Sequence, residues 1–393
     1  MQIPNLHYEF QSVFNSTKIP RSFFAPGRIN LIGEHTDYNG GNVFPASISF
    51  GTYALAQKRE DQKIRFFSMN FTDTGIIECE LSDLDYDETH SWVNFPKGII
   101  KYMCENGFNI LNGMDILYYG NIPTGAGLSS SASIEMVTGV LLEGLFDLTI
   151  DRLEIIKLGL KVENEYIGVN SGIMDQFAIG KGRKNHAILL NCQTLEYEYA
   201  PIQLDDHVIM IINTNKQRTL VGSKYNERRS QCEKALKELQ TELNIQNLGN
   251  LTIEQFKEHK HLIQDETNRK RAKHVVYENE RTLKALVLLR QGSLDLFGRL
   301  MNESHISLQN DYEVTGIELD TLVKAAWNQP GVIGARMTGA GFGGCAIAIV
   351  EKSQLDSFRY NVNQIYANAI GYEASFYTAT IGDGAREING GVL

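Results

Sequence analysis

The stretch Pro-Thr-Gly-Ala-Gly-Leu-Ser-Ser-Ser-Ala at residues 123–132 decides how the rest of the chain is interpreted. It lies between an apolar, strand-like run at 114–119 and a helix-like run at 134–146 whose apolar residues share one face. Glycines let the backbone approach a ligand closely, and the first N–H groups of a helix have no partners within it. The loop therefore either binds a polyphosphate at the positive end of the helix dipole or simply caps the helix. Its spacing is neither G-x-x-x-x-G-K-[ST] nor G-x-G-x-x-G, so it is not one of the two common nucleotide-binding fingerprints.

Composition limits the possible partners. The chain has 393 residues, 42% of them hydrophobic, which predicts a globular protein of two or three domains. The formal net charge of -10 argues against nucleic acid or an anionic membrane as the main partner. The five cysteines are scattered without a C-x-x-C pair, which favours a reducing, cytoplasmic setting. The N-terminus does not resemble a signal peptide, and no apolar run approaches ~18 residues, so we expect no membrane span.

A second informative stretch, Gly-Arg-Ile-Asn-Leu-Ile-Gly-Glu-His-Thr-Asp-Tyr-Asn-Gly-Gly, occupies residues 27–41. Its apolar start is followed at once by Glu34, His35 and Asp37, just before a tight-turn signal at Asn39-Gly40. Three hydrogen-bonding side chains within four residues suit a polyhydroxyl ligand. The alternative is a solvated loop in which the aspartate caps a turn.

Two further stretches favour a ligand site. Asp175 is flanked by apolar residues within 171–180, and a carboxylate in such surroundings must be paired, raised in pKa or functional. Taken alone, Asp175 could equally be a buried aspartate that caps a turn. A second glycine-rich unit at 337–345 joins a strand at 332–336 to another at 346–350, which indicates close approach to a ligand or to the neighbouring domain.

The remaining pattern predicts the elements around these stretches. Turn residues at 60–62 predict a hairpin between strands 53–58 and 64–71. The region 241–276 has no clear periodicity, and its basic cluster at 269–274 is diluted by acidic neighbours, which favours a solvated helix face over a nucleic-acid site. Helices are expected at 5–16, at 91–106 with a start delayed by Pro96, at 151–166 with Asp151 as N-cap, at 223–239 and at 281–290.

The stretches at 27–38, 123–132 and 337–344 occur in one order, and together they resemble the three motifs of the GHMP small-molecule kinases. The first is typical of the galactokinase branch of that family, and the resemblance runs from about residue 20 to the C-terminus. It implies an α+β fold of two domains, with a mixed sheet in residues 1–205. Residues 206–393 would form an antiparallel sheet with helices, and the active site would lie in the cleft between the two domains.

The resemblance also implies an activity. An ATP-dependent sugar 1-kinase, acting as a monomer, would transfer the γ-phosphate of ATP to the C1 hydroxyl of α-D-galactose with Mg²⁺ as the metal. Asp175 would be the catalytic base and Arg28 would stabilise the transition state. The residues that line the sugar would be Glu34, His35, Thr36, Asp37, Gly172, Asp175 and Tyr225. Those near the nucleotide would be Ser68, Thr124, Gly125, Ala126, Gly127, Leu128, Ser129 and Ser130. Ser130 and Glu163 would hold Mg²⁺, although the sequence itself does not distinguish Ser129, Ser130 and Ser131.

Two alternatives stay open on the sequence. The family has non-catalytic relatives that sense sugar and nucleotide; those known to be inactive lack residues of the serine loop, whereas Ser131 and Ala132 are present here. In N-acetylgalactosamine kinases a cysteine typically follows the Asp-Tyr of the first motif, whereas this chain has Asn39. A mevalonate or homoserine kinase would not be expected to carry the block at 34–37.

Overall fold

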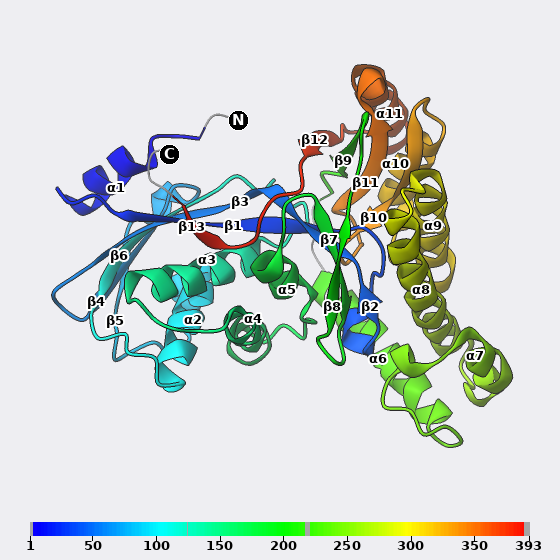
Figure 1. Cartoon of the computed structure of the whole chain (residues 1–393), viewed down its shortest axis with the longest axis horizontal. Helices are drawn as coiled ribbons and strands as arrows, with labels where there is room; N and C mark the ends of the chain where they lie inside the picture. The colour runs from blue at the N-terminus through cyan, green and yellow to red at the C-terminus, as the bar shows by residue number, and fades with distance from the viewer. Residues whose placement is uncertain (1–2, 124, 217–220, 389–393) are drawn as a thin grey trace.

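The computed structural model describes residues 3–123, 125–216 and 221–388 (Figure 1). The first half is built on a six-stranded sheet in the order β13-β1-β3-β6-β4-β5. Only β4 and β6 run parallel, so the sheet is mixed, as predicted. The strands are β1 (Arg21–Asn30), β3 (Pro45–Lys58), β4 (Lys63–Ser68), β5 (Ile77–Glu80), β6 (Met114–Gly120) and β13 (Arg386–Ile388).

The predicted hairpin around residues 60–62 is wrong, because β6 lies between β3 and β4. The turn residues bond to the segment that enters β6: the Arg59 amide donates to the Gly113 carbonyl at 2.9 Å, and the Gly113 amide donates to the Asp61 carbonyl at 2.7 Å. A Cβ on Gly113 would lie 1.9 Å from the Lys63 carbonyl oxygen, so only glycine fits where this strand enters. Local turn chemistry gives no sign of a strand that arrives from fifty residues away.

Helices cover both faces of this sheet. Alternation along β3 decides which side chains they meet: Ala54 and Ala56 belong to the main core, whereas Leu55 packs against α1 on the other face. Pro96 lies in the first turn of α2, where its missing N–H costs nothing, and so the delayed helix start is confirmed. Asp151 caps α4 as expected, through the Leu153 amide. The helices are α1 (Leu6–Phe14), α2 (Asn94–Glu105), α3 (Ser130–Leu145), α4 (Arg152–Lys161), its π-helical continuation η4 (Val162–Ile167), and α5 (Met174–Lys181).

The second half is built on an antiparallel sheet, as predicted. Its four strands lie in the order β10-β11-β9-β12. One face packs under helices, and the other face contributes Ile211 and Ile347 to a cluster that also contains Ile29 and Leu31 of the first half. The strands are β9 (His207–Asn213), β10 (Val332–Thr338), β11 (Cys345–Glu351) and β12 (Ser375–Ala379). The helices are α6 (Val221–Leu239), α7 (Ile253–His259), α8 (Glu266–Arg290), α9 (Leu294–Ser307), the π-helical η7 (Leu308–Tyr312), α10 (Gly316–Trp327) and α11 (Leu355–Ile370).

A small antiparallel sheet, made of β2 (Asn42–Val43), β7 (His186–Asn191) and β8 (Tyr197–Pro201), lies between the two larger ones (Figure 1). The predicted division at residue 205 falls in the loop from β8 to β9. As a domain boundary it stays a prediction, because β13 returns from the far end of the chain to pair with β1.

The region 241–276, expected to be irregular, contains α7 and the first part of the 25-residue helix α8. The expectation of a solvated basic face holds for Lys273, which is exposed, but is wrong for Arg271 and His274, which are buried. Arg271 donates to Gln231, to the Asp311 carbonyl and to Glu313. Because polar side chains with specific partners occupy the inner face, the apolar period that identifies a helix is missing. Even this long helix is too polar to cross a membrane, and no other described helix could.

Candidate active site

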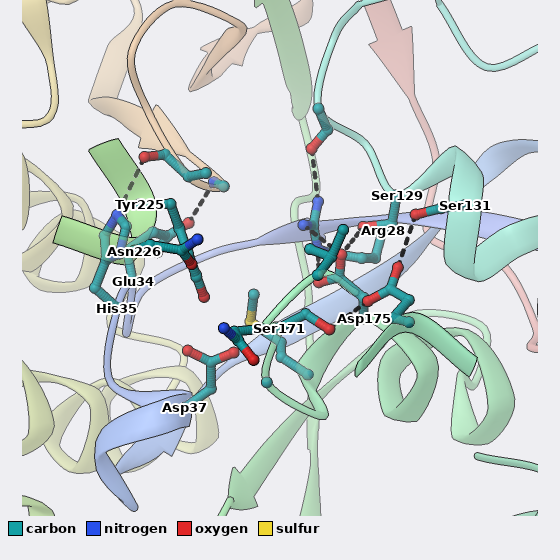
Figure 2. Close-up of a pocket in the computed structure, with 18 of the residues that line it drawn as sticks. Arg28, Glu34, His35, Asp37, Ser129, Ser131, Ser171, Asp175, Tyr225 and Asn226 are labelled. Atoms are coloured by element: carbon teal, nitrogen blue, oxygen red, sulfur yellow. Dashed lines mark hydrogen bonds and ion pairs between the residues drawn. The ribbon is translucent and has the colours of Figure 1, made fainter. Parts of the chain in front are cut away.

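A cleft of 490 Å³ lies where the two halves meet, and the predicted stretches converge on it (Figure 2). Its walls come from the end of β1 and the loop after it, the serine-glycine loop, η4 and the segment that leads into α5, the start of α6, and the turn after β10. The predicted residues that line it are Arg28, Glu34, His35, Asp37, Gly127, Ser129, Ser130, Glu163, Gly172, Asp175 and Tyr225.

Asp175, in the first turn of α5, is held by two neighbours. The guanidinium of Arg28 binds both carboxylate oxygens, with Nε–Oδ1 at 2.8 Å and Nη2–Oδ2 at 2.9 Å. The Ser129 hydroxyl donates to Oδ2 at 2.5 Å. The Asp175 side chain keeps 24% of its surface exposed against 6% for Arg28, so the carboxylate is oriented but still reachable from the cleft.

Local backbone geometry brings Arg28 to the serine-glycine loop. A register shift in β1 between Pro26 and Arg28 redirects the side chain, as bulges near active sites often do. A Cβ on Gly27 would lie 2.6 Å from the Leu128 carbonyl oxygen, so the two motifs touch only because glycine is there. The Arg28 Nη1 also donates to the Gly127 carbonyl at 2.8 Å.

Two further carboxylates share the cleft. Burial, and then the nearby Asp175, raise the pKa of Asp37 to about 6. The same two causes raise the pKa of Glu163. A Cβ on Gly172 would lie 2.1 Å from Asp37 Oδ2, so Gly172 leaves the space that Asp37 occupies. Among the described residues that line it, the cleft is thus an acidic site with one buried cation, Arg28, beside Asp175.

His35 is a neutral hydrogen-bonding group. Its backbone has φ +62°, in the left-handed region that a residue other than glycine adopts rarely and often at ligand sites. Burial, and next His274, lower the pKa of His35 to about 3. Nε2 faces the Ala340 carbonyl at 3.2 Å and must carry the proton, since a carbonyl only accepts. Nδ1 therefore accepts from the Tyr38 hydroxyl at 2.9 Å, and that hydroxyl is in turn bonded to Tyr312.

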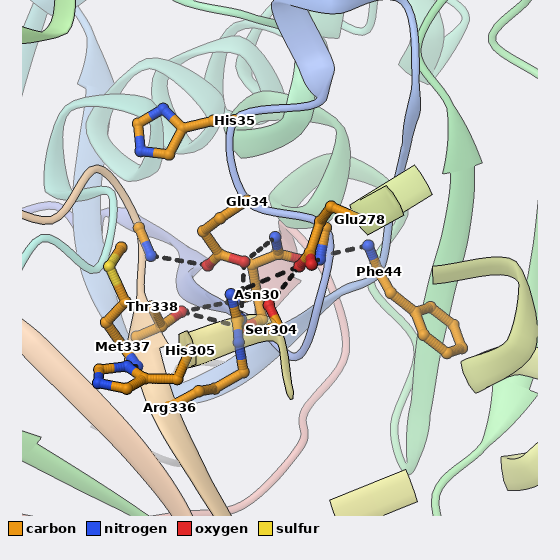
Figure 3. A network of polar contacts seen from close by, with 12 residues as sticks. Asn30, Glu34, His35, Phe44, Glu278, Ser304, His305, Arg336, Met337 and Thr338 are labelled. Carbon is orange, nitrogen blue, oxygen red and sulfur yellow. Dashed lines mark hydrogen bonds and ion pairs between the residues drawn. The ribbon is translucent and has the colours of Figure 1, made fainter. Parts of the chain in front are cut away.

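Glu34 is buried with both oxygens already engaged (Figure 3). Oε2 accepts from Arg336 Nη1 and from Asn30 Nδ2, each at 2.7 Å, and Oε1 accepts from the Gly339 amide at 2.8 Å. Burial raises the pKa of Glu34 to about 7 even though the Arg336 guanidinium favours the charged form. Glu34 thereby joins the first motif to the third.

Behind Glu34, two charged residues that we did not predict support the same loop. Arg336, on β10, is completely buried, and its Nη2 lies 3.8 Å from Glu278 Oε1. Glu278, on α8, accepts from the Gly33 amide at 2.9 Å and from Ser304. An arginine directly before the glycine unit at 337–345, inside an apolar strand, was the available signal for Arg336. Glu278 gave none.

Thr36 does not line the cleft. It is buried, and its hydroxyl donates to the carbonyls of Gly33 at 2.8 Å and Asn42 at 2.7 Å. Its predicted contact with the sugar stays a prediction. In the structure it fixes the turn that carries its neighbours.

A second cavity of 350 Å³ adjoins the first, and the two share Ser130 and Ser131. Ser68 and Gly125 line it, whereas Ala126 and Leu128 are buried in the core that joins the halves and hold the loop from behind. Thr124 lies outside the described residues. Sequence reasoning missed the aromatic wall, because its members are spread over three segments without a motif: Phe71, Trp92, Phe95 and Tyr118.

The serines next to Glu163 have different positions. The Ser131 hydroxyl donates to Glu163 Oε1 at 2.9 Å, and Ser171 donates to Oε2. Ser130, the first residue of α3, is exposed at the junction of the two cavities. A carboxylate that shares the cleft with an exposed hydroxyl suits Mg²⁺, which takes one or two carboxylates and leaves other positions to water and phosphate.

Comparison with known proteins identifies the family. The model of the GHMP kinases N terminal domain matches residues 94–183, the galactokinase galactose-binding signature matches 8–58, and the GHMP kinases C terminal model matches 285–368. A galactokinase of Ligilactobacillus salivarius is 57% identical over 96% of this chain and 97% of its own. The chain belongs to the galactokinases. A galactokinase of Clostridium beijerinckii, 58% identical over 93% of this chain and 94% of its own, agrees.

Solved structures agree with this family. The crystal structure of Lactococcus lactis galactokinase complexed with galactose has a TM-score of 0.95 and 54% identity, over 98% of this chain and 99% of that one. A mevalonate kinase at 19% identity and a TM-score of 0.62, over 92% of this chain and 99% of its own, shows only that the fold is shared. As a galactokinase within the GHMP kinases, this chain is an ATP-dependent sugar kinase.

Proposed function

We propose that this galactokinase transfers the γ-phosphoryl group of ATP to the C1 hydroxyl of α-D-galactose, with Asp175 as the base. The observation that carries the proposal is the position of Asp175, bound by Arg28 from the first motif and by Ser129 from the serine-glycine loop. A proton acceptor for the sugar thus lies directly beside the loop expected to bind phosphate. That the Lactococcus lactis relative was crystallised with galactose supports the choice of sugar.

The sugar would occupy the first cavity. Asp37 faces it with a carboxylate that can accept hydrogen bonds from hydroxyls, and Tyr225 and His35 line the same wall. Glu34 already accepts three hydrogen bonds, which fixes its orientation before a ligand arrives. A carboxylate has about four acceptor positions, so Glu34 keeps about one, in a fixed direction, for a matching sugar hydroxyl.

ATP would extend from the first cavity into the second. The aromatic residues there offer flat apolar surfaces for a purine base. The loop and the first turn of α3 would direct backbone N–H groups at the triphosphate, where the helix dipole is positive. Because the cavities share Ser130 and Ser131, the terminal phosphate would lie next to Asp175.

The reaction then needs positioning and charge balance more than covalent chemistry. As the C1 oxygen attacks the γ-phosphorus, its proton passes to Asp175. The bond from the γ-phosphorus to the β–γ bridging oxygen breaks, and ADP leaves with that electron pair. The Arg28 guanidinium balances the Asp175 charge and offsets charge that develops on the transferred group.

Ser130 and Glu163 would hold Mg²⁺, and their oxygen donors fit this ion. Burial raises the pKa of Glu163, so a cation beside it would stabilise the charged carboxylate. Bound there, the metal would neutralise part of the charge on the phosphates.

Release of ADP against a panel of galactose, N-acetylgalactosamine, glucose, arabinose and mevalonate tests the proposal. We expect galactose to be used far better than the other four. A preference for N-acetylgalactosamine would support the alternative kinase, and galactose binding without ADP release would indicate a sensor.

Replacing Ser130 with alanine should raise the Mg²⁺ concentration for half-maximal rate about tenfold, the equivalent of ~1.4 kcal/mol. The reason is loss of the proposed ligand hydroxyl at the junction of the cavities. Titration of Mg²⁺ at saturating ATP measures it, with Ser131→Ala as the matched variant. An unchanged titration for Ser130→Ala, with a shifted one for Ser131→Ala, would move the metal contact to Ser131.

Replacing Gly172 with alanine should raise the KM for galactose with a smaller effect on kcat. The new methyl group would lie 2.1 Å from Asp37 Oδ2 and must displace that carboxylate. Loss of one charge-assisted hydrogen bond corresponds to roughly 1.5–3 kcal/mol, or about 10- to 150-fold in affinity. Gly382→Ala is the control, since its nearest neighbour is 3.7 Å away. Equal KM values for Gly172→Ala and the parent would exclude Asp37 from the sugar site.

We also expect one chain to be competent alone, since every group invoked belongs to a single copy. Among the described residues no disulfide joins Cys79, Cys104, Cys192, Cys232 or Cys345, which fits the cytoplasmic location expected from the sequence.

A further inference from the structure

Glu135 is a buried carboxyl group that the proposed mechanism does not use. It lies in α3 with no exposed surface and faces Gln176, which is equally buried in α5. Gln176 Nε2 donates to Glu135 Oε2 at 3.0 Å. The other oxygen of each group, Glu135 Oε1 and Gln176 Oε1, is buried without a hydrogen-bond partner among the described residues.

A single proton would satisfy both orphaned atoms. An ionised carboxylate only accepts hydrogen bonds, so it leaves the amide oxygen of Gln176 unpaired, which costs about 1–3 kcal/mol for a buried acceptor. A neutral carboxylic acid has one O–H donor. A proton on Glu135 Oε1 can therefore be donated to Gln176 Oε1, while Gln176 Nε2 continues to donate to Oε2.

We propose that Glu135 is a neutral acid that forms a two-bond pair with Gln176, and that this pair positions Asp175 and Glu163. Its consequence for turnover rests on the proposed function; the protonation state of Glu135 does not.

The surroundings of Glu135 favour the neutral form. The charged groups that face it are Glu163 from η4 and Asp175 from α5, both acidic, and the guanidinium of Arg28 is already paired with Asp175. Burial first, and then Glu163, raise the pKa of Glu135 well above its ordinary value.

The pair is closely packed on the side that faces α4. A Cβ on Gly159 of α4 would lie 2.9 Å from Gln176 Cγ and 3.3 Å from Glu135 Oε2. The backbone of α4 therefore covers the pair directly, and the glycine is what permits this contact. The two orphaned oxygens are themselves buried, so neither is hydrated from the surface.

The pair connects to the cleft through Gln176. This residue follows Asp175 in the first turn of α5, and its side-chain amide is one of the groups that oppose the upward shift in the pKa of Glu163. A neutral Glu135 also keeps a further negative charge away from the phosphate site. Glu135 is thus a positioning residue for the base and for the proposed metal ligand.

Infrared spectroscopy of the full-length chain tests the protonation state. We expect a carbonyl band of a protonated carboxyl at neutral pH that disappears in Glu135→Gln and persists in Glu143→Gln. Glu143 is the matched control, because it lies in the same helix but is paired with Arg152. A parent spectrum without this band, or a band unchanged in Glu135→Gln, would overturn the proposal.

Stability gives a second measurement with a definite sign. The native state keeps a proton on Glu135 that the unfolded chain releases above the ordinary pKa of glutamate, so the contribution of Glu135 to stability falls as pH rises. Glu135→Gln lacks this penalty, and its melting temperature should therefore rise relative to the parent between about pH 5 and 8. A difference between them that does not change with pH would contradict a neutral Glu135.

The kcat values of two variants show whether turnover needs a neutral hydrogen-bonding group or a negative charge at position 135. Glutamine at 135 can form a two-bond amide pair with Gln176, so Glu135→Gln should keep a kcat near that of the parent. Glu135→Ala should lose about 10- to 100-fold in kcat, as partners behind a metal ligand typically do. A Glu135→Gln variant as impaired as the alanine variant would show that the charge itself is needed. If the parent releases no ADP with galactose, the proposed function fails, while the spectra still decide the state of Glu135.

Discussion

We expect Asp175→Asn to lower kcat by about 10²- to 10⁴-fold, because a general base usually contributes a factor of this size. Asparagine has the same shape but cannot take the C1 proton, and it meets Arg28 with one acceptor oxygen in place of two. Galactose should still bind, because Asp37, His35 and Tyr225 keep their places in the cleft. Single-turnover ADP formation and galactose binding, measured on the same preparation, separate the two effects.

Asp115→Asn is the matched control for this experiment. Asp115 is also a buried aspartate in a bidentate ion pair with an arginine, at 2.6 and 2.8 Å from Arg65, but it lies on β6 and does not line either cavity. Its substitution should lower stability and leave kcat nearly unchanged. A turnover close to that of the parent in Asp175→Asn would remove Asp175 as the base, and an equal loss in Asp115→Asn would attribute the effect to the lost ion pair alone.

The sequence predicted those parts of the site that depend on short, local patterns. The glycine-serine loop at 123–132 and the glycine unit at 337–345 were expected from residue types alone to come close to a ligand or to another part of the chain. Gly172 was expected at the site only through the family resemblance, and the close contact at Gly27 was not expected. Residue types did not place Arg28 beside Asp175; that expectation came only from the family resemblance. The 2.8 Å contact depends on a strand register and a helix start that no local pattern encodes.

Long-range contacts account for what sequence reasoning missed. Insertion of β6 between β3 and β4 is decided by pairing across fifty residues, whereas the turn at 60–62 looks like an ordinary hairpin. The polar inner face of α8 conceals its helical period, and so Glu278 could not be connected to the loop before Glu34. The aromatic wall of the second cavity is likewise assembled from separate segments.

Arg336 tests how far the proposed sugar site depends on its buried support. Its guanidinium is completely buried between Glu34 and Glu278, and it also donates to the Asn30 carbonyl at 3.1 Å. Replacement with methionine keeps much of the volume but leaves Glu34 without its cation, whereas Glu278 keeps Arg281 at 2.8 Å. Removing one partner of a buried ion pair costs about 3–5 kcal/mol, so we expect a large loss of stability in Arg336→Met.

The same change should also raise the KM for galactose, because Glu34 loses one of three donors that fix its carboxylate. Arg271→Met distinguishes the two effects: Arg271 is equally large and buried, but its partners Gln231 and Glu313 do not line the cleft. We expect both variants to unfold at lower denaturant concentration and only Arg336→Met to bind galactose less well. If both arginine variants raise the KM equally, loosening of the whole fold explains the loss; if Arg336→Met matches the parent in stability, the buried charges are not held by that guanidinium.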